Sequence, residues 1–150
     1  MSAAPQSTCP LCAGDGGLVL VRTPRFRVLR VQGDDAALHP AFYRLIWNEH
    51  VAEFSDLSAA DRVACMEGVA RIERVLREQL APTKINLASL GNMVPHLHWH
   101  VIARHDWDSH FPAPVWANPL RARDLAREAQ LQDALADCDA AIAQALARWA

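Results

Sequence analysis

Three histidines alternate with apolar residues between His96 and Ile102, and this stretch constrains the fold more than any other. Successive side chains of a β-strand point to opposite faces of its sheet. On a strand the histidines therefore share one face: His96, His98 and His100. The residues between them are large and apolar, which places them in a core: Leu97, Trp99 and Val101. The run thus predicts a strand over residues 96–103, with one buried face and one chemically active face.

The rest of the chain predicts further strands and two long helices. Residues 18–31 are expected to form strands interrupted near Thr23-Pro24, and Gly33-Asp34-Asp35 predicts a turn. Residues 41–47 and 85–90 are apolar runs of strand length. Ser58 is the expected N-cap of an amphipathic helix that Pro82 ends. A second helix is expected over 124–149, with Trp149 among its apolar positions.

This order of elements favours an α+β fold over a parallel βαβ design, because neighbouring strands are followed by helices. The 150 residues suit one domain, 1–150. A chain of this length buries roughly 70% of its unfolded surface, so it needs no disulfide or metal merely to fold.

Composition excludes several functional classes. The net charge of -2 gives no electrostatic reason to expect a nucleic-acid polymer or a membrane surface as partner. No apolar run approaches the ~20 residues of a membrane span. The start of the sequence lacks the pattern of a secretory signal, and the four cysteines are then expected to be reduced thiols or metal ligands. We therefore expect a cytoplasmic protein.

Two chemistries remain open for the histidine face. Imidazole is a common zinc ligand, and residues two apart on a strand can share a metal. Alternatively, a neutral imidazole can attack phosphorus and carry the phosphoryl group covalently. That role requires the other ring nitrogen to be held by a fixed acceptor, such as a backbone carbonyl. Neighbouring histidines would then donate hydrogen bonds to the phosphate or assist the leaving group.

The pattern His-φ-His-φ-His-φ-φ, with φ apolar, resembles the signature of the histidine triad (HIT) superfamily of nucleotide hydrolases and transferases. The resemblance extends to the glycine turn at 90–95, to Trp47-Asn48-Glu49-His50, and to a bacterial branch with an N-terminal Cys-x-x-Cys. It spans about residues 9–105 and leaves a C-terminal helical segment at 120–150.

The resemblance implies a HIT-like fold: an antiparallel sheet of about five strands, a long helix between strands, and a C-terminal helix. It also implies a homodimer that cleaves a nucleotide derivative, a nucleoside phosphoramidate or a dinucleoside polyphosphate, at its α-phosphate. By position, His98 resembles the nucleophile that forms a nucleotidyl-histidine. His100 resembles the residue that contacts the phosphate and assists the leaving group, and His96 resembles a supporting residue.

Three further residues are candidates for substrate binding. Asp34 lies six residues before Pro40, where the family places a polar residue on the ribose hydroxyls; an ordinary turn aspartate is the alternative. Many family members carry Gln and then Ser or Thr after the glycine turn, whereas this chain has Asn92 and Met93. Asn92 keeps an amide, but Met93 offers no hydroxyl, so substrate preference is expected to depart from that of those members.

Cys9 and Cys12 form a Cys-x-x-Cys pair, which can be half of a zinc site, a redox pair or two idle thiols. In zinc-carrying relatives the remaining ligands resemble His50 and His96. The resemblance thus implies a structural zinc at Cys9, Cys12, His50 and His96, and no organic cofactor. The other cysteines, Cys65 and Cys138, are expected to be buried in helices.

Other residues have simpler interpretations. The isolated histidines are expected in exposed or loop positions: His39, His105 and His110. Arg104 is expected on the surface, with a phosphate contact as the alternative. For Trp107 and Trp116 we favour packing over stacking on a base.

Two other functions stay open on the sequence alone. One is a non-catalytic nucleotide- or zinc-binding regulatory module with the same fold. The other is a hydrolase whose three histidines hold a catalytic metal directly.

Overall fold

The computed structural model describes residues 4–6 and 8–147. Its five strands form one antiparallel sheet in the order β1-β2-β3-β5-β4. The central pair, β3 and β5, aligns Arg44 with His100 and Ile46 with His98. The strands are β1 (Leu18–Arg22), β2 (Phe26–Arg30), β3 (Phe42–Trp47), β4 (Lys84–Ala88) and β5 (His98–Arg104). The α+β class and the five antiparallel strands expected from the sequence are confirmed.

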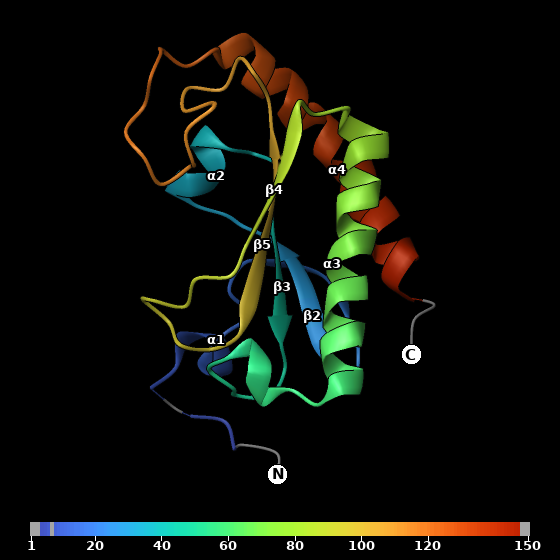
Figure 1. Cartoon of the computed structure of the whole chain (residues 1–150). Helices are drawn as coiled ribbons and strands as arrows, with labels where there is room; N and C mark the ends of the chain where they lie inside the picture. The colour runs from blue at the N-terminus through green and yellow to red at the C-terminus, as the bar shows by residue number, and fades with distance from the viewer. Residues whose placement is uncertain (1–3, 7, 148–150) are drawn as a thin grey trace.

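Two long helices, α3 (Ala59–Leu80) and α4 (Leu125–Ala147), cover one face of the sheet (Figure 1). Alternate residues of the central strands, among them Tyr43, Leu45 and Val101, are buried beneath these helices. Removing this apolar surface from water is the main stabilising contribution to the fold. Cys65 and Cys138 lie fully buried in the same core, as expected.

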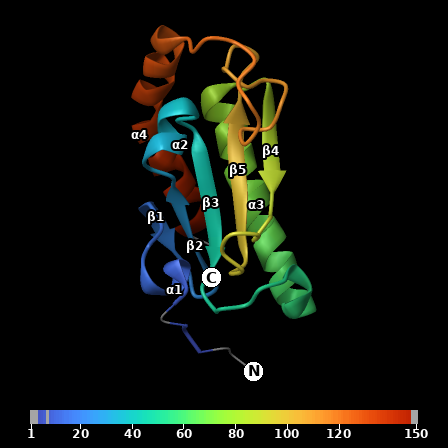
Figure 2. The same cartoon turned by 90° about the vertical axis from the view of Figure 1, so that its left-hand side faces the viewer.

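Of the part of the chain that the structure describes, the opposite face carries only short elements: α1 (Pro10–Ala13), α2 (Asp34–Leu38) and the loop that follows β5 (Figure 2). A smaller apolar cluster, which includes Leu11, Leu29, Phe42 and Ile46, holds the N-terminal segment against this face. Because no long helix covers it, polar side chains of β3 and β5 can reach a pocket there.

The helix α3 begins and ends where the sequence predicts. The Ser58 side chain accepts a hydrogen bond from the backbone N–H of Asp61 at 3.1 Å, the bond of a helix N-cap. After Leu80, Ala81 adopts the left-handed conformation and Pro82 prevents further helix.

Two local expectations were wrong. Asp34 and Asp35 begin the short helix α2 rather than a turn, since Gly33 adopts φ +94 and their carboxylates lie in the first turn, where the helix dipole favours negative charge. The strand β5 begins at His98, so His96 lies before it. The Trp149 position lies outside the described residues.

Within residues 4–6 and 8–147, no helix combines the length and the apolar character needed to cross a bilayer.

Candidate active site and metal centre

The side chains of His98 and His100 lie on the face of the sheet opposite the long helices, while Val101 lies in the core beneath those helices. Their ring centroids are 5.0 Å apart and the rings are nearly perpendicular. Both histidines are almost fully buried. The alternation of the sequence thus places two of the three histidines side by side, as predicted.

The imidazole of His98 has a defined tautomer. Its Nδ1 lies 2.6 Å from the backbone oxygen of His96. A carbonyl can only accept, so Nδ1 carries the proton and Nε2 keeps a lone pair. Burial, together with the charge of Arg44, lowers the pKa of His98 below its ordinary value, although the hydrogen bond to His96 raises it. His98 is therefore neutral near pH 7, as a nucleophile requires.

The imidazole of His100 has the opposite tautomer. The Nε of Arg44 lies 3.2 Å from Nδ1 of His100, and an arginine nitrogen can only donate. Nδ1 is therefore the acceptor, and the ring proton is on Nε2. Burial lowers the pKa of His100 to about 3, with the positive charge of Arg44 as a further cause. The ring of His100, with its Nε2–H donor, thus lies beside the ring of His98, whose Nε2 is unprotonated.

A pocket of ≈ 380 Å³ opens over the two histidines, within the size range of small-ligand sites. Larger hollows lie elsewhere on the described residues; one of them contains His105, and none contains His98 or His100. The lining of the pocket is Leu11, Arg44, Leu90, Gly91, Asn92, Met93, Val94, His98, His100 and Trp116.

The structure brings two of the three predicted substrate-binding residues to this pocket. Asn92 and Met93 belong to its lining, and the Met93 side chain is 93% exposed. Asp34 lies exposed at the start of α2 and is outside the lining. Its contact with ribose stays a prediction.

Trp116, which lies in the loop after β5, forms another part of the pocket lining. Its ring meets His100 edge to face at 5.2 Å and Phe42 at 6.4 Å. The side chain is 50% exposed, so part of the indole remains free for a ligand. Trp107, in contrast, stacks on His105 away from the pocket. Trp116 therefore combines the packing role that we favoured with access to the site.

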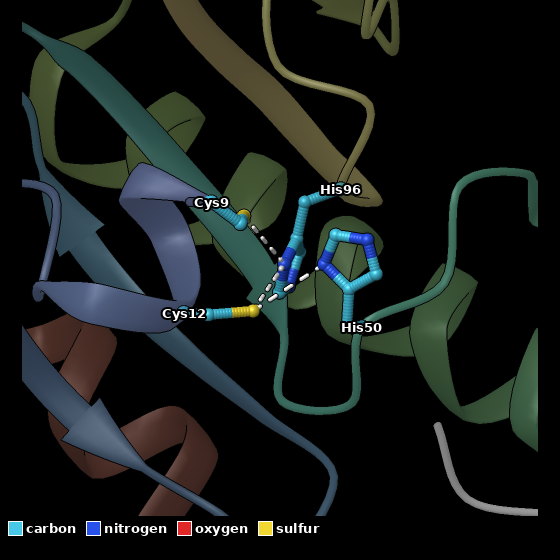
Figure 3. A group of neighbouring side chains, drawn as sticks. All are labelled: Cys9, Cys12, His50 and His96. Carbon is cyan, nitrogen blue, oxygen red and sulfur yellow. Dashed lines mark hydrogen bonds between the residues drawn. The ribbon is translucent and has the colours of Figure 1, made fainter. Parts of the chain in front are cut away.

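A second cluster of polar side chains lies beside the pocket (Figure 3). It consists of Cys9, Cys12, His50 and His96, whose candidate ligand atoms all lie within 4.8 Å of one another. Cys12 Sγ is 3.3 Å from Nδ1 of His50, and Cys9 Sγ is 3.4 Å from Nδ1 of His96. A tetrahedral zinc with bonds of about 2.0–2.3 Å separates its ligands by about 3.5 Å, so the spacing fits this metal.

The tautomer of His96 suits a metal ligand. Its Nε2 lies 2.6 Å from the backbone oxygen of Trp47 and must donate to it, which leaves the Nδ1 lone pair facing the thiols. His96 thus turns toward the cysteines instead of joining the wall of the pocket. The described residues contain one cluster of this kind, and neither His98 nor His100 belongs to it.

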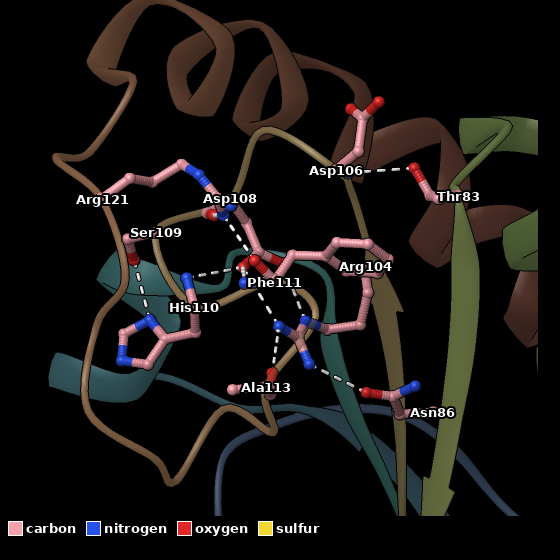
Figure 4. A network of polar contacts seen from close by, with 10 residues as sticks. All are labelled: Thr83, Asn86, Arg104, Asp106, Asp108, Ser109, His110, Phe111, Ala113 and Arg121. Atoms are coloured by element: carbon pink, nitrogen blue, oxygen red, sulfur yellow. Dashed lines mark hydrogen bonds and ion pairs between the residues drawn. The ribbon is translucent and has the colours of Figure 1, made fainter.

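The expectation that Arg104 lies on the surface was wrong, because this residue is only 1% exposed. Figure 4 shows its polar contacts. It makes an ion pair with Asp108 at 2.7 Å and also donates to Asn86 and to the backbone of Ala113. Asp108 in turn accepts from backbone N–H groups of the loop. Arg104 therefore holds the loop after β5 against the sheet, and each of its three side-chain nitrogens donates to the protein.

The isolated histidines all lie in loops, as expected, but none of them is exposed. His39 and His110 are each 5% exposed, and their rings meet at 4.9 Å. His105 is half-buried beside Trp107. The loop after β5 folds back over α2, which buries residues that lie far apart in the sequence.

Sequence reasoning missed Arg44, the residue that determines the tautomer of His100. The alternation of β3 places Arg44 on the same face as Phe42 and Ile46, but this signal does not identify its neighbour. Only the register between β3 and β5 brings Arg44 opposite His100.

Fold and site together define a histidine triad protein. The HIT domain family model matches residues 19–107, more than half of the chain. The chain therefore belongs to the HIT family. No protein with a curated description matches the sequence.

Solved structures agree with this assignment. A histidine triad protein from Bradyrhizobium japonicum is 28% identical, with a TM-score of 0.65 and coverage of 91% of this chain and 98% of its own. A histidine triad protein from Sinorhizobium meliloti is 21% identical, with a TM-score of 0.65 and coverage of 88% and 91%. A zinc-bound histidine triad family protein from Mycobacterium smegmatis is 22% identical, with a TM-score of 0.58 and coverage of 89% and 97%. The last two are similar in fold.

Proposed function

We propose that this protein is a nucleotide hydrolase or transferase that cleaves a nucleoside phosphoramidate or a dinucleoside polyphosphate at its α-phosphate. The observation that carries the proposal is the orientation of His98: its Nδ1 donates to the oxygen of His96, and its unprotonated Nε2 is left for the pocket. HIT family membership supports the same reaction class.

In the first step, the Nε2 lone pair of His98 attacks the α-phosphorus and the bond to the leaving group breaks. Nδ1 keeps its proton, and the oxygen of His96 stabilises the positive charge that develops on the ring. A phosphate leaving group departs as an anion, and an amine takes a proton from water.

The second step releases the nucleotide. Water attacks the phosphorus, the bond to Nε2 breaks with its electron pair returning to His98, and a proton goes to solvent. The Nε2–H of His100 donates to the phosphate in both steps. Because Arg44 occupies Nδ1, loss of the Nε2 proton would leave an anionic ring, so His100 acts as a donor and not as an acid.

The test is release of AMP from adenosine 5′-phosphoramidate and from diadenosine triphosphate. We expect the wild type to release AMP from at least one, and a rapid quench to trap one AMP per chain on His98. His98→Ala should abolish both signals, whereas His105→Ala, a change outside the pocket, should keep them. AMP release by His98→Ala at the wild-type rate would remove the nucleophile from the proposal. A wild type that binds nucleotide but releases no AMP would favour the regulatory module.

We also propose that the four-residue cluster holds a structural zinc, with two thiolates and two Nδ1 atoms as ligands. The zinc-bound relative from Mycobacterium smegmatis supports the choice of metal. Zinc would connect the N-terminal segment to His96, two residues before β5, and thereby stabilise the start of that strand. Metal analysis should find one zinc per chain and a loss in Cys12→Ser, but not in Cys65→Ala, because Cys65 lies in the core outside the cluster.

Two further expectations remain proposals. We infer a homodimer from the family resemblance; β4 supports it as an edge strand that exposes Leu87. Light scattering that finds only monomers at micromolar concentration would contradict it. We infer a cytoplasmic location because the four thiols are free and a cysteine-containing metal site needs reduced thiols. Cell fractionation tests the location.

A further inference from the structure

Arg44 differs from the other buried or half-buried arginines because its side chain donates to no oxygen atom of the described residues. Arg27, Arg62 and Arg71 donate to backbone oxygens, and Arg30 and Arg104 each contact a carboxylate. Moving a charged group out of water is costly unless an opposite charge or several hydrogen bonds compensate it. A partly buried arginine without such partners therefore indicates that a ligand supplies them.

The hydrogen bonds of Arg44 leave most of its donors available. Its Nε donates to His100, and its guanidinium lies 5.5 Å from the centroid of the Phe42 ring. Among the described residues, none accepts a hydrogen bond from its two terminal nitrogens, and none forms an ion pair with it. Asp35 attracts Arg44 electrostatically, but the two side chains form no ion pair. Up to four N–H groups thus remain for a ligand.

The pocket gives this guanidinium an environment suited to an anion. Its lining contains no carboxylate, and Arg44 is the residue of this lining with a permanent charge. Most of the other lining side chains are apolar, including Leu11, Leu90 and Trp116. Arg44 is therefore the cation of this lining, and its attraction for an anion is weakly screened where water is excluded.

The position of Arg44 separates it from the phosphate that is attacked. The attacked phosphate contacts Nε2 of His98 and the Nε2–H of His100, whereas Arg44 contacts the Nδ1 edge of the His100 ring. Because Arg44 contacts the nitrogen of His100 that is not used by the attacked phosphate, its two terminal nitrogens are left for another part of the substrate. We propose, on the basis of the function above, that Arg44 binds a second phosphate group of the substrate and selects nucleotides that carry one.

The second phosphate has two possible sources, the leaving group or the ribose. Three ligands separate them by isothermal titration: AMP, α,β-methylene-ADP and adenosine 3′,5′-bisphosphate. AMP has one phosphate. The methylene compound adds a phosphate on the leaving-group side and resists cleavage, and the bisphosphate adds one on the ribose.

We expect the wild type to bind one of the two doubly phosphorylated ligands at least about tenfold more tightly than AMP, the effect of a charge-assisted hydrogen-bond pair. Preference for the methylene compound assigns the phosphate to the leaving group, and preference for the bisphosphate assigns it to the ribose. Arg44→Gln should remove that preference while changing the affinity for AMP by less than about threefold. Arg44→Lys, which keeps the charge, should retain part of it.

The control is Arg74→Gln, which removes the same charge from an exposed position on α3, across the sheet from the pocket. It should leave all three affinities unchanged. The proposal is overturned if the wild type favours neither doubly phosphorylated ligand over AMP. It is also overturned if Arg44→Gln weakens all three ligands equally, which would mean that Arg44 acts only through His100. Because binding needs no turnover, absence of AMP release would refute the reaction without deciding the role of Arg44.

Discussion

Two buried neutral histidines should make the fold sensitive to mild acid, and His39 allows this effect to be measured. Burial lowers the pKa of His39 to about 4 and that of His100 to about 3. Among the described residues, Nε2 of His39 has no hydrogen-bond partner, so a proton there would have no acceptor.

The direction of the change in stability with pH follows from how readily histidine takes up a proton in the folded and in the unfolded chain. An unfolded histidine has a pKa near 6.5, so as pH falls below that value the unfolded chain takes up a proton that the folded chain does not. Stability is therefore lost between about pH 6.5 and the folded pKa of each ring. From pH 7 to pH 5 this amounts to about 2 kcal/mol per histidine, or about 4 kcal/mol for both.

The assay is denaturant unfolding at pH 7 and pH 5, with the free energy extrapolated to water. His39→Phe keeps a ring against His110 and removes the titrating group. Its loss of stability between the two pH values should be about 2 kcal/mol smaller than that of the wild type. His39→Gln tests the same change with a polar side chain, and its loss should be smaller by the same amount.

The comparison uses the change with pH, so a constant cost of substitution does not affect it. Asp108 does not contribute between pH 7 and pH 5, because both its folded pKa of about 2 and the pKa of about 3.9 of an unfolded aspartate lie below pH 5. Equal losses in the wild type and both His39 variants, to within about 0.5 kcal/mol, would refute the reasoning.

Three further predictions concern packing, the buried ion pair and the metal. In Gly68→Ala the new Cβ would lie 2.7 Å from Leu45 Cδ1 and 2.9 Å from Phe26 Cζ, and both of these side chains are buried. The free energy of unfolding should therefore fall by about 1–2 kcal/mol, although alanine has the better helix propensity. Arg104→Met leaves Asp108 buried without its cation and should cost about 3–5 kcal/mol, whereas Arg22→Met, at an exposed ion pair, should cost less than about 1 kcal/mol; equal costs would contradict the structural role of Arg104. Chelation should lower the melting temperature and the activity together, while loss of activity without any change in melting would favour a catalytic metal.

Much of the site was predictable because it depends on local periodicity. Alternation along one strand placed His98 and His100 together, and the Cys9-Cys12 spacing indicated half of a metal site. Helix caps are equally local, so Ser58 and Pro82 gave the limits of α3. Each of these inferences needed only residues within a few positions of one another.

Burial of isolated polar residues was not predictable in this way. Arg104 and His39 have no local pattern that distinguishes them from surface residues. They are buried because the loop after β5 folds back over α2 and supplies Asp108 as a partner for Arg104. Such a contact depends on the path of the loop in three dimensions, and the spacing of residues in the sequence does not indicate that path.

The sequence by itself determined the α+β class, the long helices and the paired histidines, because strand and helix periods fix which side chains share a face. Tertiary structure decided the protonation of those histidines. The oxygen of His96 holds a proton on Nδ1 of His98, and Arg44, from a strand more than fifty residues away, holds one on Nε2 of His100. The register between β3 and β5 thus makes one ring an acceptor and its neighbour a donor.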